Sequence, residues 1–259
     1  GRNTAIGHQT LSTLDAGADA YNTAVGYQAG TAVTTGVQNT IMGSLAGDAL
    51  TTGSYNVAMG HNSLSATTVG ALNTAIGNFA LSSNILTNGN VAIGQQALQV
   101  AVGDGSTNNQ ITYNTAVGYF AGKAITTAIN NTLIGGLAGD ALTTGASNTL
   151  VGKNAGGALI TGSSNTVLGH GALATEDGHG FNVAIGTSSL AVQNAGASGL
   201  NVAVGHNSGL AVTQGVKNTL IGAYAGDVIT TGDNNIIIGH EAAASAVGVD
   251  NTTVIGTAT

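Results

Sequence analysis

The sequence predicts an all-β protein, a parallel β-solenoid (β-roll or β-helix) of about fifteen 17-residue coils. Three observations predict it: a glycine returns at a nearly fixed interval, apolar residues precede it in fixed register, and an asparagine stands four residues before it. A fixed period of this length is typical of solenoids, in which each repeat is one structural unit. We therefore expect one repeat domain over residues 1–259, and a segment of a longer fibre, because both ends fall within the repeat array.

The repeat glycine sets the period. Of the fourteen intervals between its fifteen occurrences, eleven are 17 residues, two are 19 and one is 24. A glycine at such a position marks a tight corner or a backbone with positive φ. Its positions are Gly7, Gly26, Gly43, Gly60, Gly77, Gly94, Gly118, Gly135, Gly152, Gly169, Gly186, Gly205, Gly222, Gly239 and Gly256.

A short strand is expected in the three residues before each glycine. The first is always β-branched, as in Thr23, and the third is always aliphatic or Met, as in Val25. β-branched side chains fit a pleated surface and disfavour helix. These two positions share one face of a strand, and we expect that face to line the interior of the coil.

The middle residue of each strand then points to the opposite face. It is Ala in eight repeats and Ile, Leu or Val in seven. Strands that are apolar on both faces are usually buried on both faces, so this column predicts self-association into an intimate parallel homotrimer. The alternative is that Ala tolerates exposure and the larger residues tuck under loops.

The recurring asparagine has a structural interpretation. Asn side chains stacked at one corner can bond the backbone of adjacent coils and tolerate unusual turn conformations. It is present in fourteen of the fifteen repeats, with Thr252 as the exception. The structural repeat pairs include Asn22 and Gly26, Asn39 and Gly43, Asn56 and Gly60, Asn114 and Gly118, and Asn131 and Gly135.

Composition excludes several classes of function. Only 4 residues are basic and 11 acidic, for a net charge of −7, so no phosphate-binding footprint and no nucleic-acid partner are expected. No apolar run is long enough to span a bilayer, and the absence of Cys removes disulfides and thiolate metal sites. No nucleophile constellation is present, so we expect a protein that is not an enzyme and has no cofactor.

Histidine is the one weak signal for a metal. Five of the six histidines follow a repeat glycine directly: His8, His61, His170, His206 and His240. In a trimer with that corner near the axis, three of them could meet and bind a metal or an anion. A solvent-tolerant corner position explains the same pattern.

The rest of each coil varies in two ways. Four residues after the repeat glycine stands either a second Gly, as in Ala29–Gly36, or a Leu, as in Leu64. The 24-residue interval carries an insertion, 102–110, whose turn-forming residues predict a projecting loop. Such insertions often belong to a binding face, although neutral drift is equally expected. Candidate surface contacts are Asp104 and Asn108 in this loop, and Tyr27 and Tyr119 at the corner after the glycine.

The stretch Asn-Thr-Ala-Val-Gly-Tyr-Gln-Ala-Gly at 22–30 resembles two groups of proteins. One is the head repeat of trimeric autotransporter adhesins (YadA-like), whose pattern Asn-Ser-x-Ala-x-Gly-x-x-Ala/Ser is similar to 90–97, and the other is the shaft of bacteriophage tail fibres. The resemblance covers almost the whole chain and implies a trimeric, left-handed parallel β-roll with a role in attachment. The coil is longer than in the adhesin head, and no neck, coiled-coil stalk or anchor is present, which favours the phage fibre and leaves the handedness open.

The resulting hypothesis is a structural shaft, in a virion or at a cell surface, that projects a receptor-binding tip for host attachment. Its partners are itself and a host receptor or glycan. The alternative is a bacterial trimeric adhesin that binds ligands along its side. An ice-binding solenoid is a remote alternative, because its threonine pairs skip coils and form no continuous array; the pairs are Thr34 and Thr35, Thr51 and Thr52, Thr143 and Thr144, and Thr230 and Thr231.

Overall fold

The computed structural model describes residues 1–17, 19–103, 110–244 and 246–257. It confirms the all-β fold class, a parallel β-solenoid of about 14 turns with about 17 residues per coil. These residues include no helix, and therefore none long and apolar enough to cross a membrane.

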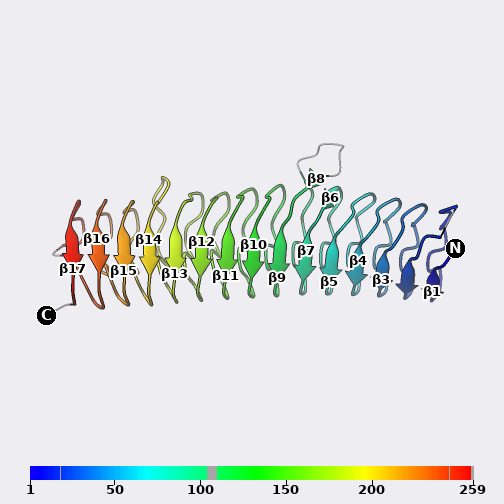
Figure 1. Ribbon diagram of the computed structural model, residues 1–259, viewed down its shortest axis with the longest axis horizontal. Helices are drawn as coiled ribbons and strands as arrows, with labels where there is room; N and C mark the ends of the chain where they lie inside the picture. Colours follow the sequence, from blue (N-terminus) through cyan, green and yellow to red (C-terminus); the bar gives the residue numbers. More distant parts are fainter. Residues whose placement is uncertain (18, 104–109, 245, 258–259) are drawn as a thin grey trace. The chain divides into compact units, whose positions relative to one another are not determined.

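The chain forms two compact units, Gly1–Asn130 and Asn131–Thr259, so the expected single repeat domain stays a prediction. Within each unit the main strands run parallel and side by side (Figure 1). The strands of the first unit are β1 (Thr4–Ile6), β2 (Thr23–Val25), β3 (Thr40–Met42), β4 (Val57–Met59), β5 (Thr74–Ile76), β6 (Thr87–Asn88), β7 (Val91–Ile93), β8 (Gln110–Ile111) and β9 (Thr115–Val117). Those of the second unit are β10 (Thr132–Ile134), β11 (Thr149–Val151), β12 (Thr166–Leu168), β13 (Val183–Ile185), β14 (Val202–Val204), β15 (Thr219–Ile221), β16 (Ile236–Ile238) and β17 (Thr253–Ile255).

Each main strand occupies the three residues before a repeat glycine, as expected. Neighbouring strands pair in strict register, so that Ala24 of β2 lies opposite Ile41 of β3. Because the register is strict, every position of the repeat forms a column through successive coils. A substitution in one coil therefore meets the same repeat position above and below it.

The face of the strands that lines the interior is the opposite of the one expected. The middle residue, such as Ala58 or Leu150, is fully buried within a single chain. The flanking residues point outward, and Val57 and Met59 remain partly exposed. The prediction was wrong because the interior of the coil is shared with side chains from the turns, so that even a residue as small as Ala, present in eight of the fifteen repeats, can face it. The middle column therefore gives no support to a trimer.

The corner at the repeat glycine is confirmed as a position that only glycine can occupy. Gly60 has a φ of +130°, and a Cβ built on it would lie 2.6 Å from the carbonyl oxygen of Gly77 in the next coil. Three residues later the chain is again tightly packed, since Ala46 and Ser63 are completely buried. Both the backbone angle and the close approach of the next coil exclude a side chain at the corner.

The asparagine column forms the expected ladder of hydrogen bonds. The backbone N–H of Asn39 donates to Oδ1 of Asn22 in the preceding coil, at 2.8 Å. Its Nδ2 donates to the carbonyl oxygen of Gly53, at 3.0 Å, and so ties the two sides of the coil together. The side chain is buried, so these bonds satisfy polar groups that water does not reach.

The two kinds of coil fill the same interior space from different positions. In the coil of Gly60, Leu64 is fully buried and the middle strand residue is Ala58. In the coil of Gly152 the large and small residues are exchanged, with Gly156 in the turn and Leu150 in the strand. The Leu150 side chain reaches the turn, because a Cβ built on Gly156 would lie 3.0 Å from its Cδ1. In these two coils the side chain that fills the centre therefore comes from the turn in one and from the strand in the other.

The insertion at 102–110 is anchored at both of its ends. Its residues 104–109, and with them the candidates Asp104 and Asn108, lie outside the described residues. The N–H groups of Val102 and Gly103 both donate to the carbonyl oxygen of Thr126, at 3.2 and 3.1 Å. At the other end β8 pairs in parallel with β6, beside the main row of strands in the first unit (Figure 1). The solenoid continues past the insertion, because β7 pairs in register with β9.

Candidate functional surfaces

The outward face of the main strands is the broadest candidate surface. It consists of two columns per unit, one β-branched and one aliphatic or Met, and none of these side chains carries a charge. Partly exposed apolar side chains therefore line the face, among them Ile134 at 40 % and Leu168 at 49 % exposure. A row of partly exposed apolar side chains, such as this aliphatic column, is typical of an interaction site. The sequence analysis identified both columns but placed them in the interior.

The five corner histidines are exposed, and four of them, His8, His61, His206 and His240, contact aromatic rings of Tyr or Phe. His8 stacks on Tyr27 with ring centroids 5.6 Å apart, and His206 meets Tyr224 edge-on at 5.3 Å. Among the residues that the structure describes, the group of potential metal ligands that does come together is a different one, Glu176–Asp177–His179. Within a single chain, therefore, the candidates His8, His61, His170, His206 and His240 are not brought together as a metal site.

The two candidate tyrosines are both about half exposed, at 50 % for Tyr27 and 51 % for Tyr119. Tyr119 stacks on Phe120 with centroids 3.9 Å apart, and the ammonium of Lys123 lies 4.2 Å from the centre of the Phe120 ring. This side of the coil thus carries a small aromatic and cationic cluster.

A second exposed aromatic corner was missed by the sequence analysis. Tyr21, Tyr55 and Tyr113 all stand immediately before a ladder asparagine, with positive φ and exposures of 48 %, 55 % and 62 %. The signal that could have found them is their common place in the repeat, one residue before the Asn. They lie in the first unit, as do Tyr27 and Tyr119.

The threonine pairs after the buried turn residue serve the backbone. Oγ1 of Thr34 donates to the carbonyl oxygen of Thr51 in the next coil, at 3.2 Å, and Oγ1 of Thr51 donates to that of Thr68, at 2.9 Å. The hydroxyls thus bond the chain internally. On the outward face, the first residue of ten of the fifteen main strands is Thr, and it is Val or Ile in the other five.

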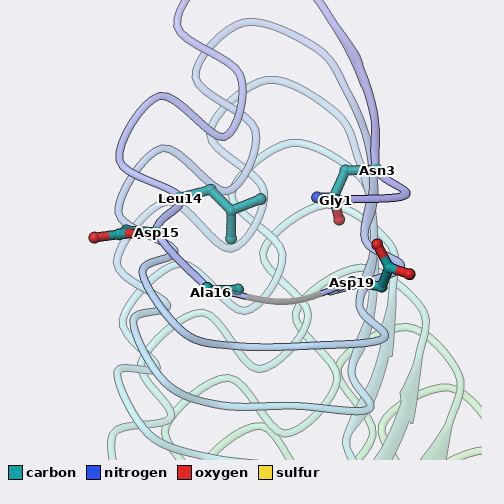
Figure 2. Close-up of a pocket in the computed structure, with 7 residues that line it drawn as sticks. Gly1, Asn3, Leu14, Asp15, Ala16 and Asp19 are labelled. Carbon is teal, nitrogen blue, oxygen red and sulfur yellow. The ribbon is translucent and has the colours of Figure 1, made fainter.

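A cavity of about 400 Å³ opens in the first coil (Figure 2). Leu14, Asp15 and Ala16 line one side of it, and Gly1, Asn3 and Asp19 line the other. Asn3 and Leu14 occupy the ladder and core positions of the repeat, which adjacent coils cover elsewhere in the chain. The cavity is thus formed by ordinary repeat positions and brings together no group of catalytic side chains.

No family model matches the chain, and no curated protein matches it. The resemblance to tail-fibre and YadA-like repeats accordingly rests on the repeat residues themselves. Function must be argued from the geometry of the coil and of its surfaces.

Proposed function

We propose that this chain is part of the shaft of an attachment fibre, of the kind found in phage tails, that holds a receptor-binding tip away from its base. The observation that carries the proposal is the repetition of one buried framework, the corner glycine, the ladder asparagine and the middle strand residue, through the described coils. Each coil adds one strand spacing, about 4.8 Å, along the axis. A chain that repeats one framework with few charges is suited to supply length and stiffness.

The shaft is proposed to be a homotrimer held by the outward strand face. Three chains that pack these faces around a common axis would remove both uncharged columns from water. Burying half of a Val or Ile side chain contributes about 1 kcal/mol, so even one such contact per coil becomes large over a whole unit. The proposal therefore keeps the expected trimer and moves its interface to the β-branched and aliphatic columns.

The setting of this shaft is proposed to be a virion or a cell surface. Its partners are then two further copies of the same chain and, through the tip, a host receptor or glycan. Neither a reaction nor a nucleic-acid partner belongs to this proposal. The few basic residues, 4 in the chain, support that choice.

Native mass spectrometry at low micromolar concentration tests the assembly. We expect a trimer for the unaltered chain and a folded monomer for the double variant Ile134→Lys with Val151→Lys, since both side chains belong to the outward aliphatic column. The double variant His170→Lys with His206→Lys adds the same number of lysines at exposed corners and is the matched control, which should stay trimeric. A monomeric unaltered chain, or a trimeric double variant, would contradict the proposed interface.

The lateral adhesin is the second candidate, and the exposed rings of Tyr27 and Tyr119 are the observation that favours it. If the chain is only a shaft, the variant Tyr27→Ser with Tyr119→Ser should leave attachment to host cells intact. Loss of attachment by a variant that is still folded and still trimeric would favour the adhesin. Ice binding is the remote alternative, and thermal hysteresis shown by a monomeric chain would favour that function over the shaft.

A further inference from the structure

One coil of the second unit replaces a core leucine by a carboxylate. Glu176 stands seven residues after its repeat glycine, the position that Leu142 and Leu159 occupy in the two preceding coils. All three side chains are fully buried. The same column also holds the buried neutral polar residues Thr67, Asn84 and Gln193, but Glu176 is its one carboxylate. A buried carboxylate is costly unless each of its oxygens finds a partner.

The two oxygens of this carboxylate differ in their surroundings. Oε1 accepts the N–H of Gly178 at 3.3 Å and that of His179 at 3.0 Å, and it lies 3.2 Å from Nδ1 of His179. Oε2 is buried and has no hydrogen-bond partner. A buried oxygen in this state costs about 1–3 kcal/mol, and more when it is charged. The local fold therefore holds the carboxylate in place while leaving one oxygen free to bind a ligand.

Two further ligand groups stand beside it. Asp177 and His179 each bring one ligand atom to within 4.8 Å of the others and of the Glu176 carboxylate. Oε1 of Glu176 lies 3.2 Å from Nδ1 of His179, so the imidazole stands next to the carboxylate whose other oxygen has no partner. Burial decreases from Glu176 through His179 to the exposed Asp177, so an ion can enter from solvent.

We propose that Glu176, Asp177 and His179 bind a divalent transition-metal ion, with Zn²⁺ as the best match, and that water completes its coordination. One imidazole with two carboxylates is a donor set suited to zinc, whereas calcium and magnesium prefer oxygen ligands alone. The ion would give Oε2 the partner that it lacks. It would also tie the buried Glu176 to the turn that carries Asp177 and His179.

A simple ion pair does not account for the same atoms. A protonated His179 would pair with Oε1, which already accepts two N–H groups, and would leave Oε2 as it is. The polar substitution also continues into the next coil, where Gln193 fills the same core position and its Oε1 has no partner. Of the four buried side-chain atoms that lack a partner in the described part of the chain, three belong to Glu176, Asn182 and Gln193. Unsatisfied polarity is thus concentrated in two consecutive coils.

Calorimetric titration of chelator-treated protein with ZnCl₂ tests the proposal, together with thermal unfolding at each zinc concentration. We expect one saturable site per chain and a Tm that rises with zinc, because an ion that binds only the folded chain stabilises it. His179→Ala should weaken binding by at least about tenfold. His240→Ala is the matched control, because His240 also lies beside an acid, Glu241, at 3.9 Å, but at an exposed corner, and it should leave zinc binding unchanged.

Glu176→Leu separates metal binding from a merely structural defect. It restores the core residue of Leu159, so without zinc the variant should unfold at the same temperature as the unaltered chain or higher, and its Tm should no longer respond to zinc. Glu176→Gln removes the charge at nearly constant shape and should lose the zinc response as well, which keeps the test decisive if the leucine variant does not fold. The proposal is overturned if the unaltered chain shows no saturable binding at a molar excess of zinc, or if the Glu176 variants respond to zinc as it does.

Discussion

The coils of Gly43 and Gly60 follow one another in the chain and fill their interiors in opposite ways. The first combines a large strand residue, Ile41, with Gly47 in the turn, and the second combines Ala58 with Leu64. The backbone at the turn position is nearly the same, with φ of +53° at Gly47 and +54° at Leu64. A left-handed conformation is unfavourable for leucine, and the buried side chain compensates for it. The comparison teaches that the corner and the ladder determine the path of the coil, and that the core only has to supply the right volume.

The order of the coils follows from the same rule. Where both positions are small, as with Ala24 and Gly30, the neighbours on either side fill the space. A Cβ on Gly30 would lie 2.9 Å from Cδ1 of Ile41 and 3.0 Å from Cδ2 of Leu11. The same arrangement recurs at Gly209, which lies between the Leu190 and Leu220 side chains. A coil that is small at both the strand and the turn position is therefore preceded by a coil with Leu in the turn (a Leu-type coil) and followed by a coil with a large middle strand residue.

The largest loss of stability is expected at the corner glycine, which both kinds of coil share. Gly60→Ala places a Cβ against the backbone of Gly77 at a φ of +130°, so one coil must move relative to the next. We expect a loss of more than about 4 kcal/mol, or failure to fold, measured by urea unfolding. The same result is expected at Gly43, because the corner does not depend on how the core is filled.

Ser63→Ala is the control for this corner. Ser63 lies buried three residues after Gly60, and its Oγ donates to the carbonyl oxygen of Gly60 at 3.0 Å. Both adjacent coils carry Ala at that position, Ala46 and Ala80. Its loss should be no more than about 1 kcal/mol. A Gly60→Ala variant as stable as the Ser63→Ala control would show that the close approach of the coils is not limiting.

An intermediate effect is expected from converting one kind of coil into the other. Leu64→Gly should cost about 2–5 kcal/mol through the cavity that it leaves, and Ala58→Ile about 1–3 kcal/mol through overpacking. The double variant reproduces the pairing of Ile41 with Gly47, so it should lose less than the two single variants together, by about 2 kcal/mol. Urea unfolding of all four proteins measures this coupling, and additive losses would contradict volume compensation within a coil.

Much of this framework could be predicted from the sequence, because it repeats. The period, the strand before each corner glycine and the asparagine ladder all follow from residues such as Asn39 and Gly43 that recur in register. The interior face could not be predicted from hydrophobicity alone, since the column with the larger apolar side chains, represented by Met59, lies outside and the one rich in Ala lies inside. Side-chain volume and the inward-pointing turn residues decided the question, and neither is visible in the strand pattern.

The candidate metal group was missed for the opposite reason. The histidine pattern directed attention to the corner after each glycine and away from His179, the one histidine outside that pattern. Glu176 is the one carboxylate in its column, and the burial of that position, shared with Leu142 and Leu159, became clear only from the structure. A repeat pattern predicts what coils share, whereas a binding group built from one exception requires the three-dimensional register.

The smallest change in stability is expected at the residue that follows the turn glycine, the Gly that stands four residues after the repeat glycine. Asp48 comes after Gly47, whereas the next coil has Ser65 after its Leu64. The Asp48 side chain is partly buried, and its Oδ1 has no hydrogen-bond partner. Burial raises the pKa of this carboxyl above its usual 3.8, although the N–H groups of Asp48 and Ala49 partly oppose the shift. The folded chain therefore holds the proton more tightly than the unfolded chain does.

The sign of the pH dependence follows from that difference. The raised pKa contributes stability that is fully present below pH 3.8 and is lost as the pH rises through the folded pKa. Asp48→Asn removes this loss, so the variant should be slightly more stable than the unaltered chain at neutral pH, by no more than about 0.5 kcal/mol, and the advantage should shrink in acid. Ser65→Ala, at the same position of the Leu-type coil, has no ionisable group and should show a difference from the unaltered chain that does not change with pH. Thermal unfolding from pH 3 to pH 8 measures both differences. An advantage of Asp48→Asn that grew in acid would mean that the surroundings of Asp48 stabilise its carboxylate, which would contradict the raised pKa.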